Sequence, residues 1–276
     1  MASALAVALS AVGSAQATVI ASDNFTNPGY VTGTTWPADD LRGQNALGTG
    51  FTGKWVNDPT TYAGITITSP GNLGRPHNNG VNAGVYANFS SPITLSSGQL
   101  YVSFDVSSAT ALNGTRVDLI SNHNAASNAY IGTQFSLGGP FGISTASSIG
   151  AASALTGIAT SGAHKIVGVL DYTNHKVSLF VDPAAGSFYS TTGANDAAAS
   201  ATWTPVSPVT FNGLGFIENY SDVATFRNLV VASAASDVGL RAAPIPEPAA
   251  WAMMLVGVGA IGGMTRRRRS SALAAA

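Results

Sequence analysis

The chain has 276 residues, of which 9% are charged, and it contains no cysteine. Ahead of a terminal arginine cluster lie eight basic and all thirteen acidic residues, so this part is net negative, which argues against nucleic acid as a partner. A domain without disulfides is held together by packing alone.

The amino end has the features of an export signal. Residues 5–12 are small and apolar, and Ala15 and Ala17 flank Gln16 in the small-x-small form of a signal-peptidase site. We therefore expect a signal peptide at residues 1–17, with signal peptidase and the export machinery as partners. No Lys or Arg precedes the apolar stretch, so either the start of the sequence is a few residues late or the export signal is weak. A buried amino-terminal helix is the structural alternative.

Residues 18–231 show the pattern of short strands. Apolar and polar side chains alternate in residues 64–68, 100–106 and 177–182, which is typical of half-buried strands. Gly, Asn, Ser, Thr and Pro fill the intervals, and no charged amphipathic helical stretch stands out. The pattern predicts one all-β domain, an antiparallel β-sandwich.

Residues 166–181 form the clearest unit, a hairpin whose turn has Asn174 at a position that tolerates positive φ. We expect loops at residues 151–162 and 193–201 and a linker at 232–244, because small residues dominate these segments. The expected core includes Phe104, Val169, Leu179 and Phe226.

The carboxyl end, residues 245–270, is built like a membrane-sorting tail. Pro246, Glu247 and Pro248 precede an uncharged segment, and the four arginines Arg266, Arg267, Arg268 and Arg269 follow it. The prolines hold the backbone extended, so the Glu247 carboxylate is presented ahead of the membrane. Basic residues that flank a membrane helix stay on the cytoplasmic side, so the arginines act as a membrane stop.

The uncharged segment at residues 249–265 predicts one transmembrane helix. A helix of this length covers about 25 Å, somewhat less than the roughly 30 Å hydrocarbon core. Trp251 at one interface and snorkelling arginines at 266–269 compensate for the shortfall. Residues 271–276 are expected to be a disordered end. The alternative is a buried core helix followed by a disordered basic end.

The order of these parts resembles the PEP-CTERM sorting signal of Gram-negative bacteria. The resemblance rests on the Pro-Glu-Pro motif, on residues 251–254, on Gly257, Gly259 and Gly262, and on the arginines. It implies that an exosortase cuts near Glu247, and that the helix holds the substrate in the inner membrane beforehand. The processed protein then resides at the cell surface or outside the cell.

A second resemblance covers most of the exported chain. Residues 23–25 and 41–55 are similar to the opening of bacterial surface domains of the concanavalin A-like, laminin G type, and residues 165–183 and 225–231 to later strands of that jelly roll. It implies two stacked antiparallel sheets in a jelly-roll sandwich. Lectins, glycanases and structural modules share that fold, so it does not select a function.

Few residues suit catalysis. The histidines show no metal-ligand spacing, and neither a G-x-S-x-G elbow nor an E-x-D-x-x-E array occurs. Glu218 and Asp222 form the best carboxylate pair, for which a solvated strand end is the preferred interpretation. The sequence therefore predicts no catalytic residue, no metal and no cofactor. The histidines are His77, His123, His164 and His175.

Binding residues are harder to exclude. Amide and carboxylate oxygens of the kind that hold calcium or sugar hydroxyls occur close together, and tryptophans offer rings that stack on sugars. Turn chemistry and core packing are the preferred interpretations. The candidates are Asn57 and Asp58, Asn78 and Asn79, Asn122 and Asn124, Asn195 and Asp196, and Trp36, Trp55 and Trp203.

Together these features predict an exported cell-surface or extracellular-matrix protein with a non-catalytic structural or adhesive role. The alternative is a carbohydrate-binding module for exopolysaccharide, which needs exposed tryptophans on a concave face. A third class, a glycan-active enzyme, needs clustered carboxylates in a cleft. The exposure of these side chains separates the three classes.

Overall fold

The computed structural model describes residues 19–34, 39–57, 65–74, 83–124, 129–136, 140–145, 152–190, 196–205, 208–219 and 222–241. The expected signal peptide at 1–17, the sorting tail at 245–270 and the helix expected within that tail lie outside these ranges. Among the described residues, no helix has the length and apolar character needed to cross a membrane.

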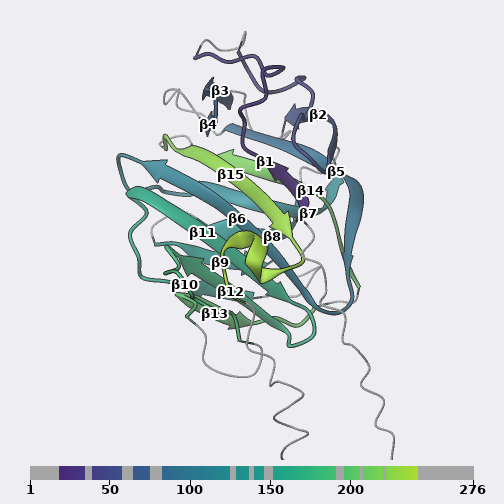
Figure 1. Ribbon diagram of the computed structural model, residues 1–276, viewed down its shortest axis with the longest axis vertical. Coiled ribbons are helices and arrows are strands. Elements are labelled where there is room, and N and C mark those ends of the chain that lie inside the picture. The colour runs from purple at the N-terminus through teal and green to yellow at the C-terminus, as the bar shows by residue number, and fades with distance from the viewer. Residues whose placement is uncertain are drawn as a thin grey trace, which may run out of the picture. The chain divides into compact units, whose positions relative to one another are not determined.

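Two sheets form the domain, and all pairings between their strands are antiparallel (Figure 1). The all-β sandwich expected from the sequence is therefore confirmed. The eight-stranded sheet contains, in order, β13 (Ala199–Thr202), β12 (Lys176–Val181), β11 (Gly162–Asp171), β6 (Gln99–Ser108), β15 (Thr225–Ala232), β4 (Asn72–Gly74) and β3 (Thr66–Ser69), with β1 (Val19–Asp23) also paired to β15. The seven-stranded sheet contains β10 (Ala152–Leu155), β9 (Gly142–Thr145), β8 (Ala129–Ser136), β7 (Arg116–Asn124), β14 (Val209–Glu218), β5 (Ala83–Leu95) and β2 (Phe51–Asn57).

The main core lies between the two sheets. Phe226 of β15 and Phe216 of β14 have ring centroids 4.9 Å apart, and the Phe216 ring also lies 5.9 Å from that of Phe25. Inward side chains of both sheets interdigitate here because they alternate with outward ones along each strand. Phe104, Leu179 and Phe226 are fully buried in this core, as expected from the sequence.

A buried carboxylate fixes the start of the domain to this core. Asp23 accepts hydrogen bonds from the backbone N–H of Phe25 at 2.7 Å and from the hydroxyl of Tyr30 at 2.5 Å. Phe25 has a positive φ of 56° and brings its ring within 6.4 Å of the Trp55 ring. Burial raises the pKa of Asp23, and its hydrogen bonds offset only part of that rise.

A second apolar cluster covers the outer face of the eight-stranded sheet, the face turned away from the other sheet. Val169 of β11 belongs to this cluster, so it is buried as expected but does not lie between the sheets. The 3₁₀ helix η1 (Ala235–Val238) lies over the same face (Figure 1). The cluster contains Tyr101, Val167, Val169, Phe180, Tyr189, Ala232, Ala235, Val238 and Leu240.

The segment that begins at residue 232 differs from the linker expected at 232–244. Ala232 is the last residue of β15, and Val238 and Leu240 bury their side chains in the outer cluster. The domain therefore continues to Arg241. Small residues in this segment look like a linker, but these few apolar side chains are sufficient to dock it.

The expected hairpin is formed by β11 and β12. The positive φ in its turn belongs to His175, at 52°, and not to Asn174 as expected. Asn174 instead donates from its backbone N–H and its side-chain amide to the buried carboxylate of Asp171, at 2.9 and 2.8 Å. These bonds fix Asn174 inside the turn, and the next residue takes the left-handed conformation.

Two segments expected as loops contain strands. β10 lies within residues 151–162, and β13 overlaps residues 193–201. Their alternating Ala and Ser residues carry no strong apolar pattern. Pairing with β9 and β12 determines their structure instead, which is a tertiary effect that local sequence does not show.

Candidate functional site

A bulge in β15 shapes the outer face of the eight-stranded sheet. The pairing of β15 with β6 shifts register between Arg227 and Val230, and Asn228 has a positive φ of 50°. As a result Arg227 and Asn228 are both exposed, while Leu229 is buried. Bulges commonly redirect side chains in this way, and here one brings two polar side chains to adjacent exposed positions.

Three charged residues stand in one row beside this bulge. Asp105 of β6 is directly paired with Lys165 of β11 on one side and with Arg227 of β15 on the other. The carboxylate of Asp105 accepts a hydrogen bond of 2.6 Å from the side-chain amide of Asn228. Within the described part of the chain, neither the Arg227 guanidinium nor the Lys165 ammonium forms an ion pair.

This charged row borders a hollow of about 420 Å³. This central hollow shares the lining residue Asn228 with a second hollow of about 430 Å³. It shares the lining residues Ser107 and Thr225 with a third hollow, also of about 430 Å³. We call the three adjoining hollows the polar groove, because most of the described residues that line them are Asn, Asp, Ser, Thr, Lys or Arg and none of these described residues is Trp, Tyr or Phe. The central hollow is lined by Asp105, Val106, Ser107, Ala163, His164, Lys165, Thr225, Arg227 and Asn228.

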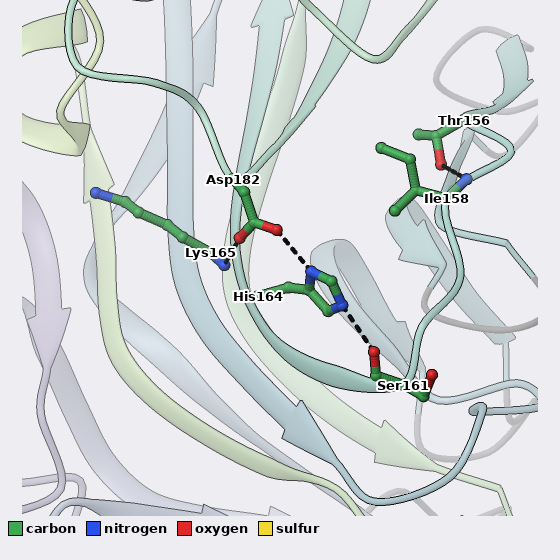
Figure 2. A network of polar contacts seen from close by, with 6 residues as sticks. All are labelled: Thr156, Ile158, Ser161, His164, Lys165 and Asp182. Atoms are coloured by element: carbon green, nitrogen blue, oxygen red, sulfur yellow. Dashed lines mark hydrogen bonds and ion pairs between the residues drawn. The ribbon is translucent and has the colours of Figure 1, made fainter.

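His164 is held at the rim of the central hollow by acceptors on both sides of its ring (Figure 2). Its Nδ1 lies 2.7 Å from the carboxylate of Asp182, and its Nε2 lies 2.9 Å from the backbone carbonyl of Ser161. The other oxygen of Asp182 accepts the backbone N–H of Lys165 at 2.8 Å. The His164 ring also packs edge-on against Phe141, with 5.1 Å between ring centroids.

The surroundings of His164 favour its charged form. Burial alone would lower the pKa of His164, but the hydrogen bonds to Asp182 and Ser161 and the Asp182 charge outweigh it, so the pKa is raised. An imidazolium donates from both nitrogens, which matches the two acceptors in Figure 2. A neutral ring leaves one nitrogen without a proton opposite an oxygen.

The carboxylate pair proposed from the sequence has structural partners. Glu218 accepts a hydrogen bond from the backbone N–H of Ala224 at 3.1 Å. Asp222 accepts hydrogen bonds from the backbone N–H groups of Asn113 and Thr115. Both carboxylates are buried, with 0% and 2% exposure, so the solvated strand end expected for them is wrong, and neither lines the polar groove.

The tryptophans that the structure describes belong to the core. Trp55 and Trp203 are both fully buried, which confirms core packing and removes them as sugar-stacking platforms. Asp196 accepts the backbone N–H of Phe188 at 3.2 Å, a contact across eight residues and not the local bond of a turn. Outside the described residues or side chains lie Trp36, Asn57, Asp58, His77, Asn78, Asn79, Asn122, His123, Asn124 and Asn195.

Sequence reasoning missed the charged row. Asp105 occupies a polar position within residues 100–106, where the alternation predicted a strand, so its outward direction could have been inferred, whereas Arg227 lies in residues 225–231, which only the resemblance marked as a strand. Their neighbourhood depends on the pairing of β6 with β15 and β11, which no local pattern reveals. Asn228 in the middle of an apolar strand was the one available hint of a bulge.

The fold is thus that of an all-β sandwich protein, and the tail adds a second assignment. Residues 244–269 match the family model described as the PEP-CTERM protein-sorting motif, which confirms the resemblance seen in the sequence. This motif implies an exported protein that an exosortase processes and that is anchored in a membrane before it reaches the cell surface. No curated protein matches the sequence.

Several solved structures are similar to this chain at a low level. The T. cruzi calreticulin globular domain is 12% identical, with 80% of this chain and 90% of that chain covered and a TM-score of 0.43. A Bacillus subtilis protein of galectin-like fold is 8% identical, with 65% and 89% covered and a TM-score of 0.43. The lectin from Bauhinia forficata in complex with GalNAc is 11% identical, with 71% and 96% covered and a TM-score of 0.35. Likeness at this level carries no conclusion about function.

Proposed function

We propose that the chain is an exosortase-sorted protein of the cell surface or extracellular matrix, whose sandwich domain has a non-catalytic structural or adhesive role. The observation that carries the proposal is the sorting motif at residues 244–269, which follows the sandwich domain in the chain. In this proposal the helix at 249–265 anchors the protein in the inner membrane, and Arg266 to Arg269 stop its translocation. Signal peptidase removes residues 1–17.

We further propose that the sandwich is of the concanavalin A-like, jelly-roll type. The support is its connectivity, since the chain repeatedly passes from one sheet to the other: between β1 and β2, β2 and β3, β4 and β5, β5 and β6, β6 and β7, β10 and β11, β13 and β14, and β14 and β15. Burial and structural hydrogen bonding of Glu218 and Asp222 support a role without catalysis. A glycan-active enzyme would need its two carboxylates beside an open cleft.

Carbohydrate binding is the second candidate function, and the polar groove is the observation that favours it. Planar polar side chains and hydroxyls line the groove, and such groups hydrogen-bond to sugar hydroxyls. The buried positions of Trp55 and Trp203 mean that recognition here depends on polar contacts and not on these rings.

The sorting proposal is tested with Glu247→Ala in a host that carries an exosortase. The substitution leaves the apolar segment and the arginines intact, so we expect a protein that is inserted in the membrane but not processed. Fractionation and immunoblotting separate the membrane form from the released form. Release of the variant at the wild-type level would leave only an ordinary membrane anchor.

The four arginines supply the matched comparison. Changing Arg266, Arg267, Arg268 and Arg269 to glutamine removes the charges that oppose translocation, while the Pro-Glu-Pro motif stays unchanged. We expect weaker retention and mixed orientation of the tail, which is a defect different from that of Glu247→Ala. Identical behaviour of the two variants would contradict the separate roles proposed for motif and stop.

A further inference from the structure

We propose that the polar groove binds an acidic polysaccharide, in which Arg227 and Lys165 hold carboxylates of uronate sugars while Asp105 and Asn228 bind hydroxyl groups between them. The inference rests on the carbohydrate-binding role given above as the second candidate function, and it names the class of ligand and the residues that select it.

The two cations of the charged row are the observation that selects an anionic ligand. Arg42 and Arg116 each form a salt bridge with a nearby aspartate, at 2.7 and 3.0 Å. Arg227 and Lys165 are exposed and, among the described residues, have no such partner. A ligand carboxylate therefore gains charge-assisted hydrogen bonds there without breaking an existing ion pair.

The spacing within the row favours carboxylates that are separated along the ligand. Neighbouring strands lie about 4.8 Å apart, so the backbones of Arg227 and Lys165 are about 10 Å apart, with Asp105 between them. Asp105 repels a carboxylate but accepts hydrogen bonds from hydroxyls. A polyuronate, in which hydroxyl groups separate the single carboxylate of each sugar from the next, fits this order, whereas a polymer with several sulfates on each sugar does not.

The bulge places the side-chain amide of Asn228 beside the guanidinium-bearing Arg227. Asn228 lines both the central and the second hollow, and its amide already orients the Asp105 carboxylate. Arg227 presents a planar fork that binds a carboxylate through two parallel hydrogen bonds, whereas Lys165 acts as a flexible point charge. We therefore expect Arg227 to contribute more to selectivity than Lys165.

The two hollows that flank the central one favour a polymer over a single sugar as the ligand. Asn24, Asn27 and Thr49 line the second hollow, and Ser107 and Thr110 line the third. A monosaccharide contacts one hollow, whereas an extended chain contacts all three and gains hydrogen bonds in each. Because none of the described residues that line the groove is Trp, Tyr or Phe, binding depends on charge and polar contacts and should weaken as salt increases.

The test uses the full-length protein in detergent and immobilised polygalacturonate, with neutral dextran and densely charged dextran sulfate as comparison surfaces. Biolayer interferometry measures the affinity of the wild type and of Arg227→Gln, Lys165→Gln and Lys54→Gln. Lys54 is an exposed cation of β2 in the other sheet, so its variant is the matched control. Circular dichroism verifies that each variant is folded.

We expect the wild type to bind polygalacturonate at least tenfold more tightly than dextran. Arg227→Gln should weaken that binding about tenfold or more and Lys165→Gln somewhat less, as for the loss of hydrogen bonds to a charged group, while Lys54→Gln should have no effect. Absence of binding, equal binding to dextran, tighter binding to dextran sulfate, or wild-type affinity of both groove variants would each overturn the inference.

Measuring the processing of the tail distinguishes a failure of the groove inference from a failure of the sorting proposal. The Arg227→Gln and Lys165→Gln variants should be processed at their Pro-Glu-Pro motif like the wild type, because the groove and the tail lie in different parts of the chain. A groove variant that loses glycan binding but is still processed supports both proposals. A wild type that is processed but binds no polyuronate refutes the groove inference alone.

Discussion

Asn228 on the outer face, and His164 beside Phe141 at the edge of the main core, show how single residues hold neighbouring charges in place. Asn228 adopts a left-handed backbone that most side chains disfavour, and its amide bonds to Asp105. His164 lies between two oxygen acceptors and keeps Asp182 beside the backbone of Lys165. Both residues hold neighbouring charges in place, so we expect substitution at either residue to lower the free energy of unfolding.

The backbone of Asn228 makes a paired prediction. Asn228→Ala and Asn228→Gly both remove the hydrogen bond to Asp105, but only alanine carries a Cβ in the left-handed region, which costs roughly 1 kcal/mol more. We expect the alanine variant to unfold at lower urea concentration than the glycine variant. Equal midpoints for the two would show that backbone strain at this bulge is negligible.

The raised pKa of His164 predicts a pH-dependent stability. Its folded pKa exceeds the unfolded value of about 6.5, so the protonated ring stabilises the fold fully below about pH 6.5, and this contribution is lost as pH rises through the folded pKa. Urea denaturation of the wild type and of His164→Gln across this range measures the effect. We expect the difference in unfolding free energy between them to shrink with rising pH.

Asp182→Asn is the matched variant for His164. It keeps an oxygen acceptor near the ring but removes the negative charge that raises the pKa, so the pH dependence should become weaker without disappearing. Parallel stability curves for the wild type, His164→Gln and Asp182→Asn would contradict the role assigned to this contact.

At the scale of elements, glycines define where strands can approach each other closely. Gly50 precedes β2 with a φ of 76°, and a Cβ at this position would lie 2.0 Å from the backbone carbonyl oxygen of Ile20 in β1. Gly98 has a similar φ of 75° in the turn between β5 and β6, where a Cβ would meet nothing within 4 Å. The two positions share the backbone requirement and differ only in crowding.

The difference in crowding between Gly50 and Gly98 predicts different losses of thermal stability on substitution by alanine. Gly98→Ala should cost roughly 1 kcal/mol, about 2–4 °C in Tm for a domain of this size, because only the left-handed conformation is strained. Gly50→Ala should lower Tm at least twice as much, because β1 must also move away from the new methyl group. Thermal unfolding followed by circular dichroism measures both values, and equal losses would rule out a close packing of β1 on Gly50.

The elements also show which local patterns determine structure. Alternation in residues 100–106 and 177–182 predicted β6 and β12, because each strand has one face in the core. β10 and β13 could not be predicted in this way, because Ala and Ser side chains differ little in hydrophobicity and pairing with neighbours forms the strand. The bulge in β15, where Leu229 is buried in the core, is likewise not marked by local alternation.

At the scale of the whole molecule, two kinds of functional feature differ in how the sequence records them. The sorting tail is contiguous, so the Pro-Glu-Pro motif, the apolar segment and the arginines could be recognised directly. The polar groove joins Asp105, Lys165 and Arg227 from three strands far apart in the chain. Only the sheet pairing brings them together, so it could not be predicted from local patterns.

In the proposed function the chain is exported and processed at both ends. Intact-mass measurement of the protein collected from the surface or medium of an exosortase-bearing host tests this most directly. We predict a mature chain that begins at Thr18, after Ala17, and that ends near Glu247 without Arg266 to Arg269. A surface protein that retains both Met1 and the terminal arginines would contradict the account.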